Sequence, residues 1–111
     1  METVKSQEQI QAEFERAAQA RARGNEGQAR VCARRAAGIA AREYFVRRGK
    51  IIRTPSAYDV LNLLAEDPEL SDELRQIAGN LTLRVNEEFK LPPDMDLIMD
   101  ARKLCEELLK E

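Results

Sequence analysis

The chain has 111 residues, of which 43% are apolar and 34% charged, and its 18 basic and 20 acidic side chains leave a formal net charge of −2. A chain of this length forms one small domain with its own core, so we expect neither disorder nor a need for disulfide or metal staples. It has no run of about 18 apolar residues, and its first residues lack the basic start and apolar stretch of a secretory signal, so we expect a cytoplasmic protein without a membrane segment.

The composition favours helices and excludes much chemistry. Aromatic residues make up 5% of the chain, which has only five Gly and four Pro. Histidine is absent, which excludes Ser-His-Asp and Cys-His catalysis and every zinc or iron site that contains histidine. The two cysteines, Cys32 and Cys105, stand far apart and form no CxxC motif, so we expect buried, reduced thiols, no disulfide, no metal and no cofactor.

Residues 6–23 predict a first, weakly apolar helix. Gly24 stands where a glycine ends a helix, and Asn25 is a typical N-cap for the next one. This second helix runs to about Arg48 and ends at Gly49. The short elbow between the two helices makes them antiparallel neighbours.

The second helix has one broad face of small residues, which predicts that it is the central helix of the fold. That face carries Ala29, Cys32, Ala33, Ala36, Ile39, Ala40 and Tyr44. Glu43 lies on the same face and allows two interpretations. Either its carboxylate reaches water at the edge, or it is buried and paired with an arginine of a neighbouring helix, Arg16 and Arg84 being the candidates.

The second half of the chain predicts three more helices. Ser56 caps a short one, which Asp67 and Pro68 end, and Ser71 caps a fourth whose apolar series continues to Val85 and Phe89. Asp94 is the expected cap of the last helix. The fold class is therefore all-α, one antiparallel bundle of four long helices and one short helix over residues 1–111. Its predicted core comprises Phe14, Ala36, Ala40, Leu61, Leu64, Ile77, Leu81, Leu97, Ala101 and Leu104.

The near-neutral total conceals a strong separation of charge. Residues 16–53 hold eleven basic and two acidic side chains, a net of +9, whereas residues 54–111 hold six basic and fourteen acidic ones, a net of −8. Five arginines of the second helix lie opposite its alanine face and predict an outward basic arc that binds an anion or a partner. They are Arg30, Arg34, Arg35, Arg42 and Arg48.

This basic arc has three possible interpretations. It is a solvated face balanced by the acidic helices of the same bundle, or one half of a self-complementary surface in a homodimer, or a phosphate footprint for nucleic acid or a nucleotide. The pI of 5.4 and the scarcity of aromatic residues for base stacking do not favour the third.

Three stretches of the chain, residues 28–45, 56–64 and 85–104, resemble the HEPN family (higher eukaryotes and prokaryotes nucleotide-binding). The first looks like the alanine-rich family helix that ends in Glu and an apolar pair, and the likeness spans about residues 25–110. The resemblance implies a small antiparallel helical bundle, usually dimeric, and a protein partner of the nucleotidyltransferase type. It also implies an acid at the position of Glu43.

The sequence departs from the family where the active members cleave RNA. Those members have an Arg followed four to six residues later by His, whereas Arg84 is followed by no histidine. Tyr58 stands where many relatives have a His, and the Arg-Tyr-Pro of the family reads Lys90-Leu91-Pro92. We therefore expect a non-catalytic protein interaction module, and not a ribonuclease that relies on Arg84 and Asn86 alone.

Two alternatives to that function stay open. The arginine face of the second helix could make the chain a nucleotide- or RNA-binding module. Residues 20–37, with a Gly-Asn turn, also resemble one hairpin of a tetratricopeptide-like repeat adaptor.

Overall fold

The computed structural model describes residues 2–82 and 96–110, and these residues form helices without any strand. The helices are α1 (Glu2–Ala22), α2 (Glu26–Arg47), α3 (Ala57–Ala65), α4 (Asp72–Leu81) and α5 (Leu97–Leu108). The predicted all-α fold is confirmed. None of the described helices is both long enough and apolar enough to cross a membrane.

Most helix ends lie where the predicted caps stand. Gly24 and Gly49 have positive φ angles of 78° and 77°, which suit the glycine that follows a helix. The side chains of Asn25, Ser56 and Ser71 each accept a hydrogen bond from a backbone N–H of the first turn that follows. These local signals therefore define the ends of α1 and α2 and the starts of α2, α3 and α4.

Two predicted boundaries are wrong by a few residues. Helix α1 begins by Glu2, because residues 2–5 contain no helix breaker. The cap of α5 is Asp96 and not Asp94: the Asp96 carboxylate accepts hydrogen bonds from the backbone N–H groups of Ile98 and Met99. Asp94 itself lies outside the described residues.

Helix α4 ends at Leu81, and Thr82 is its C-cap. The Thr82 hydroxyl donates to the Gly79 carbonyl oxygen at 2.7 Å, which satisfies an acceptor in the last turn. The predicted continuation of this helix through Val85 and Phe89 falls outside the described residues.

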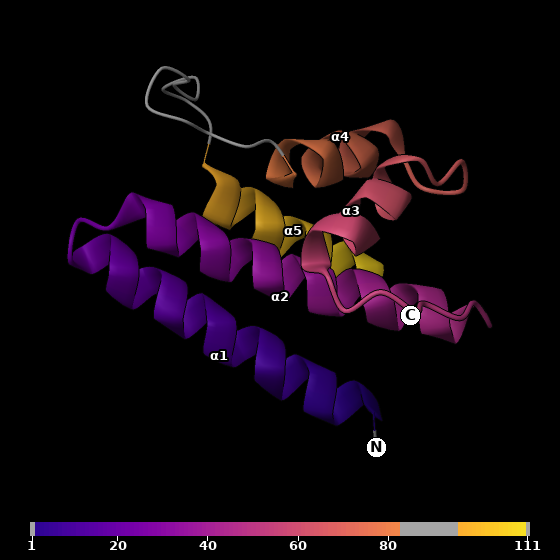
Figure 1. Cartoon of the computed structure of the whole chain (residues 1–111), viewed down its shortest axis with the longest axis horizontal. Helices are drawn as coiled ribbons and strands as arrows, with labels where there is room; N and C mark the ends of the chain where they lie inside the picture. The colour runs from indigo at the N-terminus through magenta and orange to yellow at the C-terminus, as the bar shows by residue number, and fades with distance from the viewer. Residues whose placement is uncertain (1, 83–95, 111) are drawn as a thin grey trace.

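Helix α2 is the central helix, as predicted. It packs antiparallel to α1 and also contacts α3 and α5, while α4 packs on α3 and α5 (Figure 1). Its small side chains let these neighbours approach closely. One close approach is at Gly38, where an added Cβ atom would lie only 2.5 Å from the Cβ atom of Ala57 at the start of α3.

Every residue of the predicted core is buried. These side chains form one hydrophobic cluster with the alanines of α2 and with both cysteines. A polar clamp ties the α1–α2 elbow to α5, because Arg21 donates to Glu26 at 2.6 Å and to Asp96 at 3.2 Å. The guanidinium of Arg21 lowers the pKa of both carboxyls.

Candidate interaction surface

A groove of about 510 Å³ lies between the end of α2, the connection that follows it and the end of α3. We call it the apolar groove. Its lining side chains are Phe45, Lys50, Ile51, Ile52, Leu63, Glu66, Asp67 and Pro68. One wall comes from the 48–56 connection, and the other from the last turn of α3 and the turn beyond it.

Two large apolar side chains of this groove face solvent. Ile51 is 78% exposed and Leu63 is 47% exposed, whereas Phe45 beneath them is buried at 3%. The groove is thus a surface extension of the hydrophobic core. Exposed apolar side chains are common singly, but a grooved cluster of them with a polar edge is typical of a protein interaction site.

A buried hydrogen bond supports the α3 side of the groove. The Tyr44 hydroxyl donates to Asp67 Oδ2 at 3.0 Å, and Asp67 Oδ1 accepts from the backbone N–H of Glu69 at 3.0 Å. Arg48 covers the ring of Tyr44, with its Cζ atom 4.1 Å from the ring centroid. Burial, and then the hydrogen bond to Asp67, raise the pKa of the Tyr44 hydroxyl.

The rim of the groove carries one charge of each sign. Lys50, on the connection, places its Nζ atom 5.4 Å from the centroid of the Phe45 ring, so its aliphatic stem lies along the apolar surface. Glu66 follows the last residue of α3 and is exposed. The two walls of the groove therefore present opposite charges.

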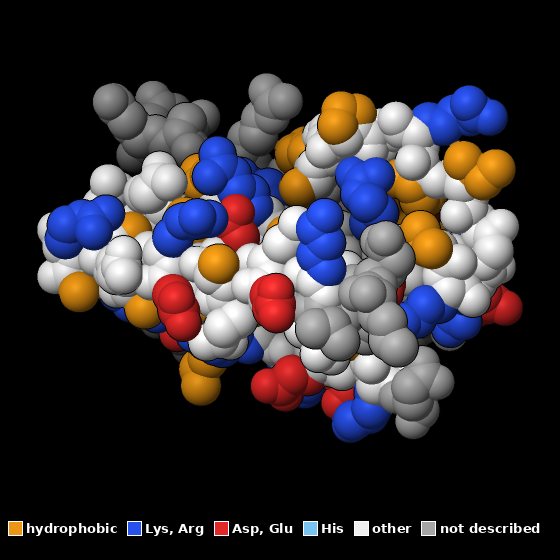
Figure 2. Space-filling model, turned by 90° about the horizontal axis from the view of Figure 1, so that it is seen from below, with side chains coloured by type: hydrophobic (Ala, Val, Ile, Leu, Met, Phe, Trp, Pro, Cys, Tyr) orange, Lys and Arg blue, Asp and Glu red, His pale blue; other side chains and the backbone are white. Residues whose placement is uncertain are grey.

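The five arginines of the predicted basic arc do not share one outward surface. Arg34 is half-buried and donates from Nε to the Leu81 carbonyl oxygen at 2.7 Å, so it satisfies the end of α4. Arg48 covers the ring of Tyr44. Arg35 and Arg42 line a separate depression. Arg30 is half-buried and lies near Glu26. On the face seen in Figure 2, basic side chains lie among acidic, polar and apolar ones and form no continuous patch.

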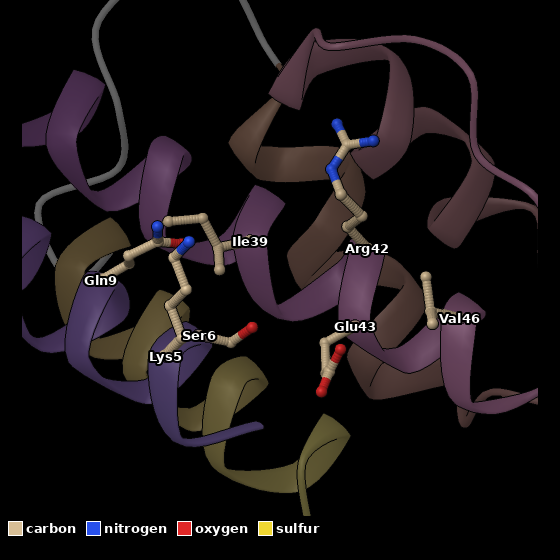
Figure 3. Close-up of a pocket in the computed structure, with 7 residues that line it drawn as sticks. All are labelled: Lys5, Ser6, Gln9, Ile39, Arg42, Glu43 and Val46. Atoms are coloured by element: carbon tan, nitrogen blue, oxygen red, sulfur yellow. The ribbon is translucent and has the colours of Figure 1, made fainter. Parts of the chain in front are cut away.

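Glu43 is buried, with 8% of its surface exposed. Its carboxylate lies 3.8 Å from Arg47 Nε, one turn further along α2, so this partner belongs to its own helix. Of the two predicted partners, Arg16 instead pairs with Glu13 at 3.4 Å, and Arg84 lies outside the described residues. Figure 3 shows the Glu43 carboxylate on the side of α2 that faces α1.

Both cysteines are buried, as predicted. Burial raises the pKa of the Cys105 thiol to about 12, so this sulfur is protonated at neutral pH and is a poor nucleophile or metal ligand. Within the described parts of the chain, no cluster of three or more acidic or cysteine side chains has the arrangement of a metal site.

The residues that distinguish the chain from catalytic HEPN proteins are described only in part. Tyr58 is half-buried in the first turn of α3. Arg84, Asn86 and residues 90–92 lie outside the described residues. No protein-family model matches the chain, and neither a search of curated proteins nor a search of solved structures finds a similar one.

The residues between Gly49 and Ser56, which form one wall of the apolar groove, carry no helical pattern that predicts a site. The signal was the adjacent pair Ile51 and Ile52 in a segment with no helical period to bury them. The pair splits: Ile52 packs against the core, whereas Ile51 points to solvent.

Proposed function

We propose that the chain is a non-catalytic, cytoplasmic helical module that acts by protein–protein interaction and forms a homodimer through the apolar groove. The observation that carries this proposal is the exposure of Ile51 and Leu63 directly above the buried Phe45. Burying these two side chains against a partner removes apolar surface from water, which is the main favourable term in association.

A second copy of the chain is the occupant that the charges of the rim favour. In a dimer with two-fold symmetry the same groove meets itself, and a residue on one wall faces a residue on the other wall of the partner copy. Lys50 of one copy then faces Glu66 of the other, twice per dimer. The groove is therefore complementary to itself in charge as well as in apolar character.

The chemistry of the chain supports a role without catalysis. It has no histidine, and the Cys105 thiol is protonated at neutral pH. The resemblance to HEPN proteins adds a second proposal, a separate partner of the nucleotidyltransferase type. Such a partner would bind the surface that the dimer leaves exposed.

Size-exclusion chromatography with light scattering tests the homodimer. The chain has a mass of 12.6 kDa, and we expect the wild type to elute with twice that mass at tens of micromolar protein. Ile51→Glu places a charge in the groove and should give the single-chain mass. Met99→Glu is the matched control, because Met99 on α5 is also a large exposed apolar residue and lies outside the groove. A single-chain mass for the wild type contradicts the proposal.

A further inference from the structure

A second depression, of about 230 Å³, lies where α1, α2 and the start of α3 meet. We call it the arginine groove. Its lining residues are Glu13, Arg35, Gly38, Ile39, Arg42, Pro55 and Ala57, none of which lines the apolar groove. Gly38 and Ala57 form its tightly packed floor, because α2 and α3 touch there. The site is therefore set on a rigid helix crossing.

Two guanidinium groups and one carboxylate line this small space. Neither Arg35 nor Arg42 has a hydrogen bond or an ion pair with any described residue, in contrast to Arg34, which donates to the Leu81 carbonyl oxygen. Figure 3 shows Arg42 pointing away from the adjacent Glu43, so the nearest acid in sequence does not neutralise it. Two like charges in one depression attract an anion, and the guanidinium fork matches a phosphoryl group.

The same depression contains a carboxylate oxygen that lacks a hydrogen bond. Glu13 Oε2 lies 3.4 Å from Arg16, but Glu13 Oε1 is buried and has no hydrogen-bond partner among the described residues. An unsatisfied buried acceptor costs free energy, which a hydroxyl or amino donor on a ligand would recover. Glu13 also repels a bare anion, so it selects against ligands that lack such a donor.

The size of the depression indicates a small ligand. At about 230 Å³ it is smaller than the roughly 300–1,000 Å³ of sites for drug-sized molecules. It continues into a neighbouring depression that shares Ile39 and Arg42 and is lined from α1 by Lys5, Ser6 and Gln9 (Figure 3). This extension offers the cation Lys5, the polar side chains of Ser6 and Gln9, and the carboxylate of Glu43 to the rest of the ligand.

We propose that the arginine groove binds a small phosphorylated compound, with its phosphoryl group on Arg35 and Arg42 and a nearby hydroxyl or amino group donating to Glu13. The class fits a sugar phosphate better than free phosphate, because the sugar hydroxyls are donors separate from the phosphoryl group, so one ligand can reach Glu13 while its phosphoryl oxygens accept from both arginines. The site is independent of the proposed dimer, since the two grooves share no residue.

Isothermal titration calorimetry of the full chain tests this site with ribose 5-phosphate and inorganic phosphate as probes. We expect ribose 5-phosphate to bind more tightly than phosphate. The double variant Arg35→Gln/Arg42→Gln should weaken its binding by roughly tenfold or more, as expected for the loss of two charge-assisted contacts. The control Arg23→Gln/Arg30→Gln removes the same charge outside the groove and should bind within about twofold of the wild type.

The Glu13→Gln variant tests the second half of the proposal. Without the negative charge, phosphate should bind more tightly, and the preference for ribose 5-phosphate should fall. Thermal unfolding confirms that each variant is folded. The proposal is overturned if the wild type binds neither probe at millimolar concentration, or if both double variants weaken binding equally. A competition with single-stranded RNA gives a further test: RNA that binds and is not displaced by ribose 5-phosphate also overturns the proposal.

Discussion

The two grooves of this small bundle differ in what they expose: the arginine groove lies along residues 35–42 of α2, and the apolar groove lies at the C-terminal end of the same helix. The apolar groove presents Ile51 and Leu63 above Phe45, with Lys50 exposed on one wall and Glu66 exposed on the other, beside the buried Asp67. The arginine groove presents two guanidinium groups that have no ion pair with a described residue, and a buried carboxylate oxygen, above a floor of Gly38 and Ala57. The first therefore suits a protein surface, and the second suits a small polar anion.

The packing of the helices around α2 explains how one small bundle forms two kinds of site. The small residues of α2 let α1, α3 and α5 pack closely against it, and the two grooves lie at the end of α2 and at its contact with the start of α3. The connection after α2 contributes the apolar pair Ile51 and Ile52 to the apolar groove. Where α2 meets the start of α3, the charged side chains of Arg35, Arg42 and Glu13 line the arginine groove.

The largest expected change in stability comes from a buried residue of the apolar groove, whereas an exposed residue of the same groove should change stability little. Phe45→Ala should lower the free energy of unfolding by about 3–5 kcal/mol, because it leaves a cavity in the core. Ile51→Ala should change it by less than about 0.5 kcal/mol in dilute protein, where association adds nothing. Chemical denaturation measures both. Similar losses for the two variants would show that Ile51 belongs to the core.

The next effect concerns the floor of the arginine groove. Gly38→Ala should cost about 1–3 kcal/mol, because the new methyl group meets the Cβ and Cα atoms of Ala57. Gly79→Ala is the matched control: it also lies within a helix, has nothing within 4 Å of the added atom, and should gain up to about 1 kcal/mol. Thermal unfolding of the two variants checks this prediction. An unchanged stability of Gly38→Ala would show that α2 and α3 are not tightly packed at this contact.

A smaller effect is expected at the wall of the apolar groove. Tyr44→Phe removes the hydrogen bond to Asp67 and should cost about 1 kcal/mol at neutral pH. The raised pKa of Tyr44 means that the folded chain holds this proton more tightly than the unfolded chain. Its stabilisation is therefore complete below about pH 10, the ordinary tyrosine pKa, and is lost as the pH rises through the folded pKa.

Denaturation curves from pH 8 to 11 check this dependence. The wild type should lose stability more steeply above pH 10 than Tyr44→Phe, so the difference between them should shrink as the pH rises. If the stability of both proteins falls equally with pH, the Tyr44 hydroxyl does not make the described hydrogen bond to Asp67.

The parts of the fold that were predictable are those that depend on neighbours in sequence. Gly24, Ser56 and Ser71 act within one helical turn, so their roles follow from residue type and spacing. Asp94 is the expected cap of α5 because it directly follows Pro92-Pro93, whereas the observed cap is Asp96; both offer a carboxylate, and local pattern does not choose between them. The Arg47 partner of Glu43 follows from i, i+4 spacing on α2, whereas the predicted candidates are arginines of neighbouring helices.

Neither groove was predictable in the same way, since each depends on tertiary packing. Arg35 and Arg42 belong to the predicted arc, but only the position of α1 and α3 separates them from Arg34 and adds Glu13. The exposure of Ile51 likewise depends on the path of the connection across α3.

A charge-swap pair tests the self-complementary dimer most directly. In a dimer of the Lys50→Glu variant two acidic side chains face each other, and in a dimer of the Glu66→Lys variant two basic ones do. Each variant alone should therefore give mainly the single-chain mass in light scattering at low ionic strength. An equimolar mixture restores both attractive pairs and should return to twice the single-chain mass. Single variants that associate as well as the wild type, or a mixture that stays at the single-chain mass, would contradict a homodimer built on this groove.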